Sequence, residues 1–240
     1  MSLRVAFDMD GTVADMHAVL RQERERLFGP PAPRETPAAG SGPATDPSPA
    51  AAAAGSTATP AVDGLQLTAR QQSQLWERVA AIENFWNTLP ELEPGIIARI
   101  AETARKRRWE VLFITTRPPS AGDTTQLQTQ RWLQAHGFPL PSVFVVQRSR
   151  GKLADALQLD AVVDDRPENC LDVAIDSKAR PVLVWHGPLE TAPAGLRKMG
   201  VKPVTSISAA LALLERMDDE RKQSSVVRTI RRMLRRDSPA

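Results

Sequence analysis

Short apolar runs alternate along the chain with longer segments in which apolar residues recur at helical spacing. The apolar runs are Leu3–Phe7, Val111–Ile114, Val143–Val146, Ala161–Val163 and Pro181–Trp185. Continuous runs of this length are typical of strands that are buried on both faces of a parallel sheet. Between them, segments such as Ile96–Lys106 and Thr125–His136 predict helices, and shorter ones are expected at Leu153–Leu157 and Ser208–Met217. The pattern therefore predicts an α/β fold in which helices cover both faces of a parallel sheet.

A long insertion separates the first two predicted strands. Its two ends predict helices, one over Ala14–Phe28 and one that begins after Thr68, a suitable N-cap residue. From Gly29 to about Val62 the sequence consists mainly of Pro, Ala, Gly, Ser and Thr. Few residues there are large and apolar, so burial cannot offset the entropy lost on ordering, and we expect residues 29–62 to be disordered.

Polar residues that can carry chemistry follow three of the predicted strands. Asp8 and Asp10 come after the first strand, Thr115 after the second and Asp164 after the fourth. The carboxyl ends of parallel strands meet at one edge of the sheet, where ligands bind, so these side chains can converge. Gly11 permits a tight turn and close approach to a phosphate. The alternative is a capped turn with solvated carboxylates.

The sequence Phe-Asp-Met-Asp-Gly-Thr at residues 7–12 resembles the first motif of the haloacid dehalogenase superfamily, and three further motifs follow in the expected order. The resemblance implies a magnesium-dependent phosphohydrolase, with Asp8 as the nucleophile and Asp10 as the general acid and base. The second motif matches residues 111–115, and Thr115 would donate its hydroxyl to a phosphate oxygen. Thr116 is either a neighbouring substrate contact or a helix cap.

The third and fourth motifs would supply a cation and the remaining metal ligands. Lys152 fits the cation by its place 12 residues before Asp164, and Arg148 and Arg150 are nearby alternatives, while an ordinary surface cation is also open. The fourth motif matches the run from residue 161 to 169. It implies that Asp164 or Asp165, with Asp8 and the backbone carbonyl of Asp10, holds Mg²⁺, a hard cation that suits carboxylates.

The resemblance also implies a domain organisation. The superfamily inserts a cap between its first two motifs, so we expect a Rossmann-like core of residues 1–14 and 93–218, with a small helical cap at 15–92 that contains the Pro/Ala-rich insertion. Residues 84–95, the Arg-Gly-Lys at 150–152 and the Asp-Asp-Arg-Pro-Glu-Asn run resemble the 5′(3′)-deoxyribonucleotidase-like group. Aromatic cap residues of that group stack on the substrate base. Phe85 or Trp86 would do so here, unless the pair packs in the core; Arg150 is a further candidate for substrate contact.

Charge is distributed unevenly. Residues 221–240 hold seven Lys or Arg and one Asp, whereas residues 1–220 hold 24 basic and 27 acidic residues. The predicted basic tail, 219–240, accounts for the net charge of +3, so this charge is no evidence that the body binds nucleic acid. Val226, Ile230, Met233 and Leu234 recur at helical spacing among the arginines, which suits an anionic lipid surface, a nucleic acid or an acidic partner. A solvated terminus is the alternative.

The remaining composition bounds the setting. The chain has one cysteine and no apolar run of the roughly 20 residues that a membrane span needs, and its first predicted strand starts too early for a signal peptide. We therefore expect a cytoplasmic enzyme without a membrane span. We expect it to hydrolyse a small phosphate monoester, a nucleoside monophosphate first. A polynucleotide 3′-phosphatase and a non-catalytic protein that binds through its tail are the alternatives, and the oligomeric state is open.

Overall fold

The computed structural model describes residues 2–30, 65 and 67–236, the last 13 of these by backbone alone. Most of the insertion that we expect to be disordered lies outside the described residues. Among the helices that are described, none is both long and apolar enough to cross a membrane.

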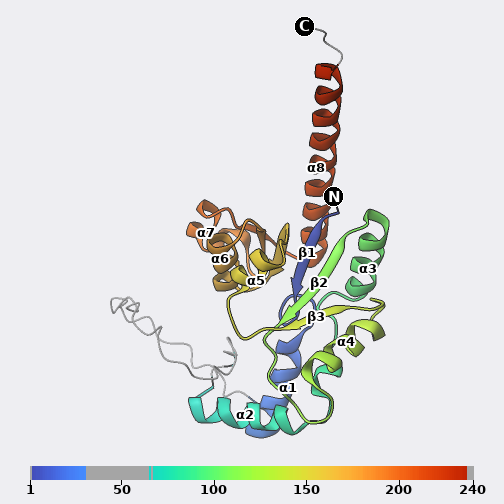
Figure 1. Ribbon diagram of the computed structural model, residues 1–240. Helices are drawn as coiled ribbons and strands as arrows, with labels where there is room; N and C mark the ends of the chain where they lie inside the picture. The colour runs from blue at the N-terminus through green and yellow to red at the C-terminus, as the bar shows by residue number, and fades with distance from the viewer. Residues whose placement is uncertain (1, 31–64, 66, 237–240) are drawn as a thin grey trace, which may run out of the picture.

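A six-stranded parallel sheet forms the centre of the molecule (Figure 1). Its strands are β1 (Arg4–Asp8), β2 (Glu110–Thr115), β3 (Ser142–Val145), β4 (Ala161–Asp164), β5 (Arg180–Val184) and β6 (Lys202–Val204). They lie in the order β3-β2-β1-β4-β5-β6. The predicted α/β fold is confirmed. The pattern did not predict β6, because three residues that include a proline give no recognisable apolar run.

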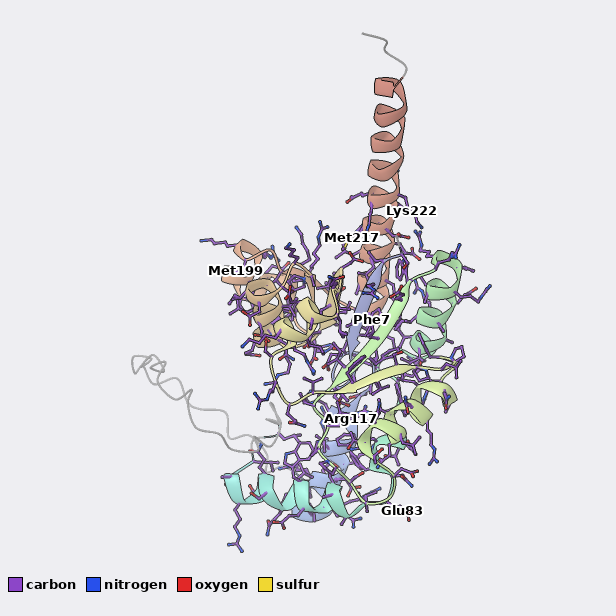
Figure 2. All side chains as sticks on the ribbon, in the orientation of Figure 1. Phe7, Glu83, Arg117, Met199, Met217 and Lys222 are labelled. Carbon is purple, nitrogen blue, oxygen red and sulfur yellow. The ribbon has the colours of Figure 1, made fainter. Side chains whose placement is uncertain are left out.

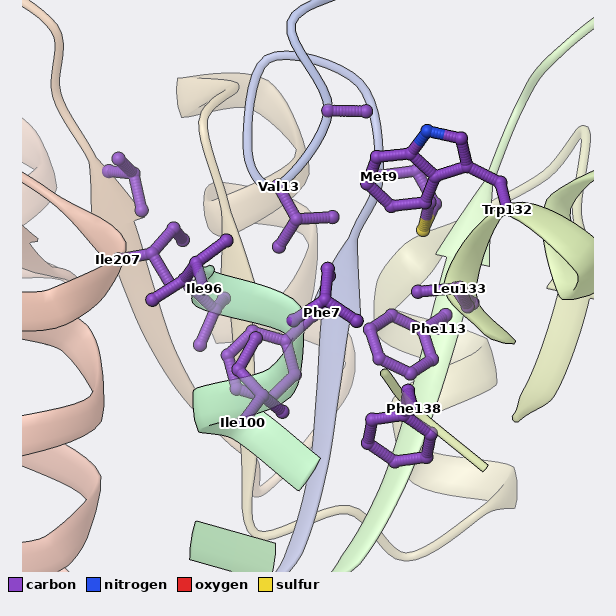
Figure 3. Close-up of a cluster of buried hydrophobic side chains, with 14 of the residues drawn as sticks. Phe7, Met9, Val13, Ile96, Ile100, Phe113, Trp132, Leu133, Phe138 and Ile207 are labelled. Carbon is purple, nitrogen blue, oxygen red and sulfur yellow. The ribbon is translucent and has the colours of Figure 1, made fainter. Parts of the chain in front are cut away.

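Alternate residues of each strand face opposite layers of helices. Val5 and Phe7 pack with α3 (Ile96–Arg107), α4 (Thr125–Ala135) and α8 (Ile207–Arg236), and Phe7 lies at the centre of this cluster (Figure 3). Ala6 faces the other side, where α5 (Arg150–Ala156) and α6 (Pro167–Asp176) cover the sheet. A short helix, α7 (Ala194–Lys198), packs beside α6, and a 3₁₀ turn, η2 (Leu189–Thr191), precedes it. Because both faces are covered, the strands are apolar throughout, as the sequence shows.

The segment between β1 and β2 forms a separate group of helices. This group, called the α1–α2 layer here, contains α1 (Met16–Phe28), α2 (Ala69–Ala81) and a 3₁₀ turn, η1 (Phe85–Asn87). Thr68 caps α2 in a capping box with Gln71, as the sequence predicted for this N-cap. The layer lies beyond the C-terminal ends of the strands (Figure 1), where a cap would have to lie.

Backbone hydrogen bonds at both of its ends hold the α1–α2 layer to the core. At its base, the Asp15 amide donates to the Pro90 carbonyl and the Leu92 amide to the Val13 carbonyl, both at 2.9 Å. At its far end, the Asn84 amide donates to the Ala121 carbonyl at 2.7 Å, on the loop between β2 and α4. The layer therefore has a fixed position over the edge of the sheet.

Helix α8 is longer than the sequence pattern predicted and runs through the expected boundary between core and tail. Asp218 is buried, accepts a hydrogen bond from Trp109 Nε1 at 3.0 Å and forms an ion pair with Lys222 at 2.7 Å. Arg221 forms an ion pair with Asp160 at 2.6 Å. These bonds hold the first residues of the predicted tail against the body.

Candidate functional site

Three carboxylates meet where the strand order of the sheet reverses. Strand β1 is paired with β2 on one side and with β4 on the other, so Asp8 and Asp164 end neighbouring strands at the point where ligands bind in open α/β sheets. Carboxylate oxygens of Asp8, Asp164 and Asp165, called the acidic cluster here, all lie within 4.8 Å of one another. The structure thus brings together the first and fourth motifs as the sequence predicted.

Hydrogen bonds orient each member of the acidic cluster. The Asp10 amide donates to Asp8 Oδ2 at 3.1 Å. Asn169 Nδ2 donates to both oxygens of Asp164, at 3.1 and 2.9 Å. The Thr12 hydroxyl donates to Asp165 at 3.0 Å.

Gly11 makes room for the cluster. Its φ of +84° favours glycine, and a Cβ at this position would lie only 2.3 Å from Asp165 Oδ2. The turn that the sequence predicted at Gly11 is therefore what allows the first motif to approach the fourth.

The cluster is buried, which changes its protonation equilibria. Burial and the neighbouring Asp164 carboxylate raise the pKa of Asp8 well above its usual range. Burial, and then Asp165, raise the pKa of Asp164 to about 6. Burial, and then Asp8, raise the pKa of Asp165 to about 7. A bound cation would lower all three, because it favours the charged form of each group.

Arg150 is the cation that faces the cluster. Its Nη2 donates to Asp8 Oδ1 at 2.6 Å, and its Nε lies 3.8 Å from Asp164 Oδ2. Nε and Nη1 are buried and have no hydrogen-bond partner within the described structure. Two charged donors are thus free to bind an anion at the cluster.

Helix geometry explains why Arg150 and not Lys152 takes this place. Ser149 caps α5, so Arg150 is the first residue of the helix. Gly151 lets α5 pack closely on α6, since a Cβ there would lie 2.2 Å from the Asp172 carbonyl oxygen. Lys152 is two residues further on, about 200° around the helix at 3.6 residues per turn, and its side chain is exposed, as is that of Arg148. The structure does not bring the predicted Lys152 to the site.

Asp10 is held by a second buried arginine, which the sequence pattern did not indicate. Arg117 donates from Nε to both carboxylate oxygens of Asp10, at 2.9 and 2.8 Å, and from Nη2 at 2.7 Å. The Thr115 hydroxyl donates to the same carboxylate at 3.2 Å and accepts a hydrogen bond from the Arg117 amide. The predicted Thr115 is therefore at the site, bound to Asp10 in this structure. Arg117 directly follows the strand-end Thr-Thr pair, a position that is itself a signal for a site residue.

A cavity of about 330 Å³ opens above these groups. Asp8, Asp10, Arg117 and Arg150 line its floor. Its walls include three tryptophans, Trp76 and Trp86 from the α1–α2 layer and Trp185 from the end of β5, together with Met16, His17, Thr116, Arg166 and Glu168.

Of the candidate substrate contacts, Arg150, Thr116 and Trp86 line this cavity. Phe85 packs edge-on against the Trp86 ring, with centroids 5.0 Å apart, and both side chains are buried in the hydrophobic core, the alternative that the sequence left open for this pair. The Trp76 indole N–H is buried and has no hydrogen-bond partner in the described part of the chain.

Comparison with solved structures places this arrangement in a known fold. No protein-family model and no curated protein matches the chain. Among solved structures, the chain is similar to a putative β-phosphoglucomutase from Thermotoga maritima, with a TM-score of 0.52 and 17% identity over 90% of this chain and 99% of that one. It is equally similar, with a TM-score of 0.52, to a HAD family hydrolase from Deinococcus radiodurans with bound phosphate and sodium, at 13% identity over 89% and 96% of the two chains. The protein thus has the α/β fold of haloacid dehalogenase-like hydrolases.

Proposed function

We propose that the protein is a magnesium-dependent phosphomonoesterase in which Asp8 is the nucleophile. The observation that carries the proposal is the acidic cluster, of which Asp8 and Asp165 line the cavity. Arg150 faces this cluster with two buried N–H donors that have no hydrogen-bond partner among the described residues. Such a site needs both a cation and an anion to satisfy its buried charges. The Deinococcus hydrolase of the same fold contains phosphate, which supports phosphate as the anion here.

The residues present fit a magnesium ion. Asp8, Asp164 and Asp165 offer hard oxygen ligands from two adjacent strand ends, and few protein ligands leave room for the waters that Mg²⁺ retains. The Asp10 backbone carbonyl would be a further ligand. When bound, the ion would offset negative charge on the phosphate and on Asp8.

The chain's own groups would then divide the reaction into two displacements. An Asp8 carboxylate oxygen attacks phosphorus, the bond from phosphorus to the ester oxygen breaks, and Asp10 gives its proton to that leaving oxygen. In the second step Asp10 takes a proton from a water, which attacks the phosphorus of the aspartyl-phosphate and releases inorganic phosphate and Asp8. Arg150 binds phosphate oxygens through its two free donors in both steps.

A small substrate with a flat, apolar group suits the cavity better than a nucleic acid end. The volume of 330 Å³ lies in the lower part of the range of about 300–1,000 Å³ for small-ligand sites, and tryptophans from two sides narrow it. Nucleoside monophosphates are therefore the first choice of substrate. A polynucleotide 3′-phosphatase would need the α1–α2 layer to move aside, and a non-catalytic protein would have no use for the buried acidic cluster.

Turnover of a panel of phosphate monoesters with and without Mg²⁺ tests the proposal. Asp8→Asn should abolish turnover, because an amide cannot act as the nucleophile. Arg150→Ala should reduce kcat/KM by about 10²-fold or more, since it removes charge-assisted bonds to the phosphate, whereas Lys152→Ala on the same helix should have little effect. An equal loss of kcat/KM in Arg150→Ala and Lys152→Ala would contradict the assignment, as would turnover by Asp8→Asn within tenfold of wild type.

A further inference from the structure

Arg117 is enclosed between three parts of the molecule. Its guanidinium binds both oxygens of Asp10, donates from Nη1 to the Thr129 hydroxyl of α4 at 3.0 Å, and lies 4.9 Å from the centre of the Trp86 ring. The side chain is 0% exposed. Figure 2 shows Arg117 between the strand ends and the α1–α2 layer. Arg117 therefore contacts the core, the candidate acid and the layer above at once.

The contact with Asp10 fixes more than a charge. A guanidinium that binds both oxygens of a carboxylate sets its plane as well as its position, which a lysine ammonium cannot do. The Asp10 carboxylate lies outside the acidic cluster, and its other described side-chain partner is the Thr115 hydroxyl. The orientation of Asp10 toward the cavity thus depends mainly on Arg117.

Trp86 connects this pair to the α1–α2 layer. Its indole N–H donates to the Pro118 carbonyl at 3.0 Å, and its amide donates to Gln128 Oε1 at 3.1 Å, so the ring has a fixed position over Arg117. A guanidinium over an indole face is attracted to it, more strongly where both are shielded from water. Any displacement of η1 would therefore also displace the guanidinium that holds Asp10.

We propose that Arg117 is a positioning residue that orients the Asp10 carboxylate for proton transfer and, through Trp86, makes that orientation depend on the placement of the α1–α2 layer. This inference rests on the proposed phosphomonoester hydrolysis. Proton transfer requires Asp10 to lie within hydrogen-bond reach of the leaving oxygen, and small displacements cost large factors in rate.

The dependence on the leaving group distinguishes positioning from a general structural role. An alkoxide leaving group needs the proton from Asp10, whereas 4-nitrophenolate is stable as an anion and needs it little. Arg117→Lys keeps the charge but not the two-point contact. It should lower kcat/KM for glycerol 3-phosphate by about 10²-fold, the lower end of the contribution of general acid catalysis. For 4-nitrophenyl phosphate it should lower kcat/KM by less than tenfold. The ratio kcat/KM reports only the steps up to release of the leaving group, so it excludes hydrolysis of the aspartyl-phosphate, in which Asp10 acts equally for both esters.

The chain offers a matched control and a second variant. Arg107 also pairs with two carboxylates, those of Asp218 and Asp219, and lies 6.0 Å from the centre of the Trp109 ring, but it is on α3, away from the cavity. Arg107→Lys should lower kcat/KM equally, if at all, for the two esters. Trp86→Leu should give the same preference for the aryl ester as Arg117→Lys, but to a smaller degree.

The outcomes separate failure of the inference from failure of the proposed function. If the wild type is active and Arg117→Lys lowers kcat/KM by the same factor for both esters, Arg117 is structural and the inference is wrong. If the wild type hydrolyses neither ester with Mg²⁺, the proposed function is wrong, and hydrogen exchange then decides whether Arg117 links the layer to the core. The Asn84 and Trp86 amides should exchange at least tenfold faster in Arg117→Met than in Arg107→Met; equal exchange in the two variants overturns the link as well.

Discussion

The close approach of Gly11 to Asp165 gives a sharp test of the site's geometry. Gly11→Ala places a Cβ 2.3 Å from Asp165 Oδ2, far inside van der Waals contact, on a backbone with φ of +84°. Gly200 is a matched control, because its φ of +85° is nearly the same and a Cβ there would meet nothing within 4 Å. The difference between the two alanine variants therefore isolates the clash from the cost of positive φ.

The magnitudes follow from these two contributions. Gly200→Ala should lower the free energy of unfolding by about 1–2 kcal/mol, the cost of a left-handed conformation for an L-residue. Gly11→Ala carries the same cost and, if its surroundings stay in place, about 1–3 kcal/mol of overpacking besides. The clash can also be relieved if the Asp165 carboxylate turns away from Gly11 and gives up its bond to Thr12. In that case one ligand of the proposed magnesium site moves.

Two measurements on each variant check this reasoning. Urea unfolding gives the loss in the free energy of unfolding, and the rise of melting temperature on adding Mg²⁺ reports the metal site, since a ligand that binds only the native state stabilises it. We expect Gly200→Ala to keep the full rise and Gly11→Ala to lose most of it. If Gly11→Ala is no less stable than Gly200→Ala and keeps the rise, then Gly11 does not approach Asp165 as described.

Three further expectations follow from the charged groups. The native-state pKa values of Asp164 and Asp165, about 6 and 7, are raised above those of the unfolded chain. Protonation of these two groups therefore stabilises the native state fully below about pH 4, and this stabilisation is lost as pH rises through 6–7. Melting curves without metal should show this decline, and Mg²⁺ should stabilise the protein more at about pH 8 than at about pH 5. Asp218→Ala leaves the buried Trp109 indole N–H unpaired and should cost about 1–3 kcal/mol in urea unfolding, more than Asp219→Ala. Truncation after Gln223 retains the ion pairs of residues 221 and 222. It should leave turnover unchanged and weaken any salt-sensitive binding to anionic vesicles. Loss of turnover would mean that the end of α8 contributes to the site.

The strand-end residues of the site could be predicted from the sequence because each directly follows an apolar run. A buried strand fixes the place of its last residue, and parallel strands bring their ends to one edge, so Asp8, Thr115 and Asp164 converge without further information. Short or irregular elements gave no such signal. Helix α6 begins at Pro167, a favourable first residue of a helix, but its first three residues belong to the fourth motif, and the apolar pattern predicts no helix there.

The basic residues of the site could not be ranked in the same way. Arg148, Arg150 and Lys152 lie within five residues of one another, and which of them faces the cluster depends on where α5 begins and on the close packing at Gly151. Neither can be derived from apolar spacing. Arg117 comes soon after the end of its strand, a position that can mark a site residue. A long basic side chain is ordinarily expected at the surface, however, and only the structure shows that Arg117 is enclosed.

The balance of charge at the cavity floor shows why the cations matter to the proposed chemistry. The acidic cluster and Asp10 contribute four carboxylates, and Arg117 and Arg150 contribute two guanidinium groups. Above the raised pKa values of the acidic cluster, where all six groups are ionised, they have a net charge of −2 in the described structure, so a phosphate dianion that entered alone would meet repulsion. A divalent cation brings the net charge to zero and leaves the free donors of Arg150 to bind the anion. At such a pH phosphate should therefore bind more tightly when Mg²⁺ is present. The whole chain, with 31 basic and 28 acidic residues, has the opposite sign of net charge, and this local deficit appears only when the fold brings the six groups together.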